Sequence, residues 1–103
     1  MSNATTFTIT IGLESPALTE KQAEQLAHAL AAKHFPSGHT ITQATGRWES
    51  ERGIVDEPSL IITVIGEGQA YRAAVGAFCH EYKKQAEQDA VLLQITKPET
   101  YWI

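Results

Sequence analysis

Two segments with helical spacing of apolar residues separate four segments that are typical of strands, and this order restricts the folds open to the chain. The strand-like segments are residues 6–13, 39–48, 60–65 and 90–95. Helices are expected over residues 20–34 and 71–82, where apolar side chains recur every three or four positions. The order is therefore β-α-β-β-α-β.

This order predicts a ferredoxin-like α+β sandwich. In that topology the four strands are antiparallel in the order 4-1-3-2, and both helices cover one face of the sheet. The second strand is polar, as an edge strand should be, and the third is apolar on both faces, as a central strand should be. We expect residues 1–5 to be a disordered or tag-derived N-terminus and residues 6–103 to form a single domain.

Composition narrows the classes of partner. The 103 residues carry a formal net charge of −4, so no basic face for nucleic acid is expected. No apolar run is long enough to span a membrane and no signal peptide is visible, so no membrane partner is expected. Cys79 is the one cysteine, which excludes an internal disulfide and fits a cytoplasmic location.

Motifs for known catalytic or cofactor chemistry are missing from the sequence. The four histidines do not have the spacing of metal ligands, and Gly66-Glu67-Gly68 lacks the lysine of a phosphate-binding loop. Cys79 belongs to the apolar stripe of the second helix and is expected in the core. We therefore predict no metal and no cofactor, and whether the chain is an enzyme stays open, with the balance toward a non-enzyme.

The predicted topology brings three connections, residues 12–19, 47–57 and 85–89, to one end of the sheet. The candidate ligand-binding residues at this end are Arg47, Trp48, Glu57 and Gln88. Arginine is suited to holding an anion, and a glutamate can accept protons. The alternative is that residues 49–57 form a solvated charged turn and that Glu57 pairs with Arg47, which would make the cluster structural.

Several short motifs resemble those of the DUF3574 family. They are Phe35-Pro-Ser-Gly-His-Thr-Ile41, Gly46-Arg-Trp48, Glu57-Pro-Ser59, Tyr82 and Gln88-Asp-Ala-Val-Leu92, with Ile11-Gly12-Leu13 similar to the opening strand. The family is of unknown function, so the resemblance implies a family label and no mechanism. The sequence departs from many members in lacking a signal or lipoprotein segment and in having Pro58 directly after Glu57.

Two hypotheses on function follow. The first is a non-enzymatic binding or assembly module that forms a homo-oligomer, a dimer, through the sheet face without helices. Ile61 and Leu92 would contribute apolar atoms to that face, and the C-terminal residues Tyr101-Trp102-Ile103 would need cover. The second is a small enzyme, or a binder of a small anionic ligand, that uses the Arg47/Glu57 end. A carboxylate with a perturbed pKa inside a concave pocket would favour the second.

Overall fold

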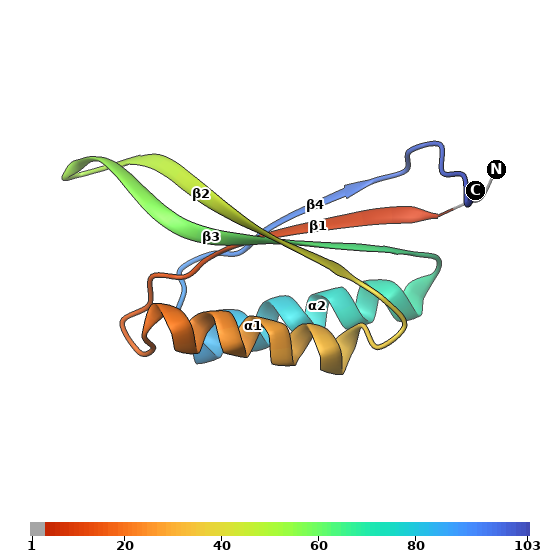
Figure 1. Ribbon diagram of the computed structural model, residues 1–103, viewed down its shortest axis with the longest axis horizontal. Coiled ribbons are helices and arrows are strands. Elements are labelled where there is room, and N and C mark those ends of the chain that lie inside the picture. Colours follow the sequence, from red (N-terminus) through yellow and green to blue (C-terminus); the bar gives the residue numbers. More distant parts are fainter. Residues whose placement is uncertain (1–3) are drawn as a thin grey trace.

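The computed structural model describes residues 4–103 and has two helices packed on one face of a four-stranded sheet (Figure 1). The elements are β1 (Thr5–Gly12), α1 (Glu20–His34), β2 (Thr40–Ser50), β3 (Gly53–Gly66), α2 (Gln69–Gln85) and β4 (Leu92–Thr96). The sheet order is β2-β3-β1-β4, and every neighbouring pair is antiparallel. The predicted ferredoxin-like α+β sandwich is confirmed, with β2 at an edge and β3 in the interior of the sheet.

The core lies between the sheet and the helices. In β1, Phe7, Ile9 and Ile11 are at most 1% exposed and pack in one cluster with buried residues of both helices. Helix α1 contributes alanines such as Ala23 and Ala27 to this cluster, so its backbone can lie close to the sheet. The start of α1 is fixed by a capping box between Thr19 and Gln22.

The other side of the sheet, here called the open face, has no helix over it (Figure 1). Opposed residues of antiparallel strands point to the same side, so the register defines which residues belong to this face. They are every second residue within four ranges: Thr6 to Gly12, Thr40 to Trp48, Val55 to Ile65 and Leu92 to Thr96. Within these four series the only ionisable side chain is that of Glu57.

The hairpin between β2 and β3 corrects one prediction. Residues 49–57 are not a charged turn, because the two strands stay paired as far as Ser50 and Gly53 and form a ribbon beyond the helices (Figure 1). The Ser50 hydroxyl closes the short turn by accepting from the Arg52 N–H at 3.1 Å and donating to the Gly53 carbonyl at 3.0 Å. Charged side chains can line this ribbon because both of its faces meet water.

The ends of the chain also differ from the prediction. Of the expected N-terminal segment 1–5, residues 1–3 lie outside the described residues, Ala4 is buried, and Thr5 begins β1 opposite Gly66. Strand β4 begins at Leu92, two residues later than expected. Neither helix within residues 4–103 has the length and apolar character that crossing a membrane would require.

Candidate functional site

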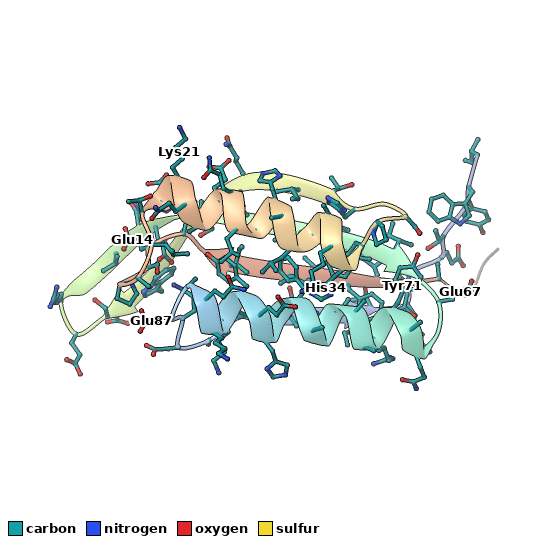
Figure 2. All side chains as sticks on the ribbon, turned by 90° about the horizontal axis from the view of Figure 1, so that it is seen from below. Glu14, Lys21, His34, Glu67, Tyr71 and Glu87 are labelled. Atoms are coloured by element: carbon teal, nitrogen blue, oxygen red, sulfur yellow. The ribbon has the colours of Figure 1, made fainter. Side chains whose placement is uncertain are left out.

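A hollow of about 740 Å³ opens beside the base of the hairpin, partly on the open face. We call it the Glu57 hollow. Gly12, Gly46, Trp48, Glu57, Ser59 and Gln88 are among its lining residues, together with Arg47. All four residues proposed from the sequence therefore line one hollow, although they come from two separate connections, residues 47–57 and 85–89. Figure 2 labels Glu14 and Glu87, two further lining residues, at this end of the molecule.

Glu57 is the buried charge of this hollow, since only 5% of its surface is exposed. Its Oε2 accepts a hydrogen bond from the Glu14 backbone N–H at 3.1 Å. Its Oε1 lies over Gly12, where the Cβ of any other residue would overlap it. Gly12 is thus the residue that makes room for the carboxylate on the open face.

The second oxygen of Glu57 has a different environment from the first. No described residue donates a hydrogen bond to Oε1, whereas every fully buried side-chain nitrogen or oxygen within residues 4–103 has a partner. It follows that Oε1 is not sealed in the core and reaches the hollow. A carboxylate so placed has one oxygen held by the backbone and one available to a ligand.

Burial raises the pKa of the Glu57 carboxyl above its ordinary value of 4.5. The hydrogen bond from Glu14 opposes this shift and lowers the pKa, while the Glu14 carboxylate raises it further. A carboxylate with a raised pKa in a concave site favours a small enzyme or a small-molecule binder over an assembly module.

Tyr82 and Gln88 hold the segment that faces Glu57. The Tyr82 hydroxyl, on α2, donates to the Gly12 carbonyl at 2.6 Å, and the Gln88 amide donates to the Glu14 carbonyl at 2.7 Å. Burial, followed by the negative charge of Glu57, raises the pKa of Tyr82 to about 12. The Tyr82 hydroxyl therefore remains a donor across the physiological range. Gln88 fixes the wall of the hollow by holding the backbone.

Trp48 forms the aromatic wall and is 45% exposed. Its ring leans over Gly46, where an added Cβ would lie 3.1 Å from the ring atom Cζ3 and 3.0 Å from Ser59 Oγ. Gly46 lies opposite Glu57 in the β2–β3 ladder, so the Trp48 ring and the Glu57 side chain lie near each other on the open face. A half-exposed aromatic face beside a buried carboxylate offers both stacking and charge to a ligand.

Arg47 points away from this arrangement. Its Nε donates to Asp56 Oδ1 at 2.6 Å and its Nη2 donates to Asp56 Oδ2 at 3.1 Å, an exposed pairing that raises the pKa of the guanidinium. The alternative in which Arg47 pairs with Glu57 is wrong, because Arg47 is opposed by Asp56 and Gly46 by Glu57. Adjacent strand residues point to opposite faces, so the two charges are on opposite sides of the ribbon.

The sequence did not indicate the backbone groups that partner Glu57 and Gln88, and it named Tyr82 as a helix residue and a family motif without a role for its hydroxyl. These hydrogen bonds join residues 43 or more positions apart, which leaves no local signal in the sequence. No cluster of three or more metal-ligating side chains occurs within residues 4–103, so the hollow has no evident metal ligand set. Cys79, on the core side of α2, has its pKa raised by burial.

The family model described as "Protein of unknown function (DUF3574)" matches residues 6–101. The chain belongs to the DUF3574 family. The resemblance seen in the short motifs is thereby confirmed, and five of its residues, Gly12, Gly46, Trp48, Glu57 and Gln88, line the Glu57 hollow of this DUF3574 protein. No functionally curated protein matches the sequence.

Solved structures share the fold at low sequence identity. A phage SAM lyase in complex with S-methyl-5'-thioadenosine is 17% identical with a TM-score of 0.72, covering 94% of this chain and 83% of that chain. CutA from Synechococcus elongatus is 15% identical with a TM-score of 0.58, covering 95% and 79% of the two chains. CutA1 from Oryza sativa is 9% identical with a TM-score of 0.60, covering 95% and 82%. At these identities the likeness concerns the fold alone.

Proposed function

We propose that this DUF3574 protein is a small-molecule-binding module and that the Glu57 hollow is its ligand site. One observation carries the proposal: Glu57, a residue that is only 5% exposed, keeps one carboxylate oxygen without a protein donor beside a hollow of about 740 Å³. A buried charge costs free energy unless it is fully paired. A ligand that completes the pairing of Glu57 would recover part of that cost.

A structural role explains only part of the arrangement. The contacts of Tyr82, Gln88 and Glu57 Oε2 with residues 12–14 hold the connection between β1 and α1. A neutral glutamine at position 57 could accept the same hydrogen bond from Glu14 without a buried charge. The unpaired oxygen, the half-exposed Trp48 ring and the volume of the hollow are left unexplained by such a role.

The proposal is tested by screening a panel of small metabolites for thermal stabilisation of the full chain and of two glycine variants. Gly12→Ala would push the Glu57 carboxylate into the hollow, whereas Gly66→Ala perturbs the opposite end of β3. The expected result is a compound that stabilises the wild type and Gly66→Ala but not Gly12→Ala. Equal stabilisation of all three proteins, or no stabilising compound, would overturn the proposal.

The panel should include SAM and S-methyl-5'-thioadenosine, because the phage SAM lyase shares the fold. Conversion of SAM during the incubation, followed by chromatography, tests the alternative that the protein is a small enzyme. The enzyme alternative is supported by the raised pKa of Glu57 inside a hollow, because many active sites combine these two features. Conversion that is lost in Glu57→Gln would favour an enzyme over a binding module.

A second candidate role is assembly into a homo-oligomer, a dimer, through the open face. Depletion of charged residues distinguishes the core of interfaces from other surfaces, and Glu57 is the only ionisable residue in the open-face series. Ile65 and Leu92 of this face are 38% and 55% exposed, and Trp102 in the nearby C-terminal segment is 74% exposed.

The single cysteine, Cys79, remains consistent with the proposed cytoplasmic location.

Light scattering at high micromolar concentration tests the assembly. A dimer mass is expected for the wild type, and Thr8→Lys should shift the protein toward the monomer because it places a charge in the middle of the open face. Gln25→Lys, on an exposed position of α1, introduces the same charge away from the sheet and should leave the mass unchanged. A monomer mass for the wild type would reject assembly and leave the ligand site untouched.

A further inference from the structure

We infer that the Glu57 hollow selects a small organic cation, a protonated amine or an onium group attached to a flat or apolar part. This rests on the proposed function and names the class of ligand. It also replaces the anionic ligand expected from the sequence.

The charges that line the hollow are predominantly negative. The ionisable lining residues are Glu14, Arg47, Glu57, Glu87 and Asp89. Arg47 is the only cation among them, and both of its hydrogen-bonding contacts go to Asp56. An anionic ligand would therefore approach four carboxylates without a free guanidinium to neutralise it. A cation is attracted by the same group of charges.

The free oxygen of Glu57 supplies the direct partner for such a cation. Oε2 is occupied by the Glu14 N–H, and Oε1 has no donor within the described residues and reaches the hollow. A hydrogen bond or ion pair made in a partly desolvated site is stronger than the same contact at an exposed surface. The binding of a cation would thus give Oε1 a partner that no described residue supplies.

Trp48 favours an organic cation over a simple ion. Tryptophan has the strongest cation–π interaction of the aromatic side chains, and the same ring can stack on a flat ligand. The ring stands over Gly46, directly across the ladder from Glu57, so one ligand can contact both groups. No set of three or more metal-ligating side chains lies within residues 4–103, which gives a bare metal ion no comparable site.

The test uses three probes with one ring and different head groups: phenethylamine, phenethyl alcohol and phenylacetate. Each is titrated into the full chain at neutral pH while the amide signals of Gly12 and Gly46 and the Trp48 indole signal are followed by NMR. We expect the amine to bind roughly tenfold more tightly than the alcohol, which corresponds to one charged hydrogen bond, and phenylacetate to bind most weakly.

Variants assign the preference to the site. Glu57→Gln keeps an acceptor for the Glu14 N–H, so it should lose most of the preference for the amine while retaining the affinity for the alcohol. Glu67→Gln removes an exposed carboxylate from the opposite end of the molecule and should retain the preference (Figure 2). If Glu57→Gln does not fold, the three probes on the wild type still decide the matter.

The outcomes separate this inference from the proposed function. Tighter binding of phenylacetate, or equal binding of amine and alcohol, would overturn the cation preference while the hollow remains a ligand site. If none of the three probes nor any compound of the metabolite panel perturbs the hollow, the proposed function fails and the inference fails with it. A preference for the amine that survives in Glu57→Gln would also contradict the inference.

Discussion

At each end of the sheet a glycine makes room for an aromatic ring, but the hollows beside the two rings differ. At one end Gly46 accommodates the Trp48 ring, and at the other Gly66 accommodates the Tyr71 ring, which a Cβ at Gly66 would approach to 2.5 Å. The Tyr71 end has a hollow of about 270 Å³ whose lining contains no carboxylate, whereas the Glu57 hollow is about 740 Å³. The contact between a glycine and an aromatic ring is therefore a packing feature that both ends share. The buried carboxylate of Glu57 is the feature that distinguishes its end from the other.

The largest effects are expected from adding one methyl group at each end. Gly12→Ala and Gly66→Ala should each lower the free energy of unfolding by about 1–3 kcal/mol, because each overfills a packed site. Only Gly12→Ala should abolish ligand binding at the Glu57 hollow. Urea denaturation and the probe titrations measure the two effects separately. Loss of binding in Gly66→Ala would remove the distinction between the two ends.

A double-mutant cycle sharpens this result. Gly12→Ala should cost much less in a Glu57→Ala background, where its Cβ has no carboxylate to overlap. Additive effects of the two substitutions would contradict the close approach of Gly12 and Glu57.

Tyr82→Phe should lower the free energy of unfolding by about 1–3 kcal/mol, because it leaves the Gly12 carbonyl without its buried donor. The ring of Phe fills the same core volume, so the loss measures the hydroxyl group. Urea denaturation gives the free energy, and the amide signal of Gly12 should shift. An unchanged stability would mean that the Gly12 carbonyl finds another donor.

Glu57→Gln should change how stability depends on pH. The folded protein holds the Glu57 proton more tightly than the unfolded chain, because the pKa is raised above 4.5 in the folded state. The contribution of Glu57 to stability should therefore fall as the pH rises from that ordinary value through the raised pKa. The difference between the wild-type and Glu57→Gln unfolding curves, measured across this range, isolates the contribution. The same measurement on Glu67→Gln serves as the control, and an identical curve for Glu57→Gln would contradict the raised pKa.

The smallest effect is expected from Arg47→Ala. The ion pair with Asp56 is largely exposed, with 68% and 52% of the two side chains accessible, so its loss should leave thermal stability nearly unchanged. Affinity for the amine probe should also be nearly unchanged or slightly higher, since a positive charge leaves the neighbourhood. A marked loss of binding would assign Arg47 to the site after all.

Much of the fold was predictable because the sequence shows the alternation of apolar residues typical of strands and the spacing of three or four residues typical of helices. The polarity of β2 and the two-sided apolarity of β3 predicted an edge and a central position, and the connections then brought Arg47, Trp48, Glu57 and Gln88 to one end. The register of the hairpin was not predictable, since a shift of one residue reverses every face. The pairing of Arg47 with Asp56 rather than Glu57 depends on that register.

The chemistry of the hollow depended on tertiary contacts that no local pattern encodes. Gly12 reads as an ordinary strand end in the sequence, and its importance follows only from the carboxylate lying over it. Tyr82 fits an apolar helix stripe, and its hydroxyl finds the Gly12 carbonyl only because α2 packs beneath β1. The sequence could indicate which end collects polar residues, and the structure was needed to identify the buried acid among them.

The central claim, a buried carboxylate with one oxygen open to a cationic ligand, is tested most directly by NMR titration of the Glu57 carboxyl carbon, assigned with Glu57→Gln. In the free protein this carbon should titrate with a pKa above 4.5, the ordinary value. With phenethylamine at saturation the pKa should fall, because the bound cation favours the ionised form. A pKa at or below the ordinary value in the free protein, unchanged by phenethylamine, would contradict the account.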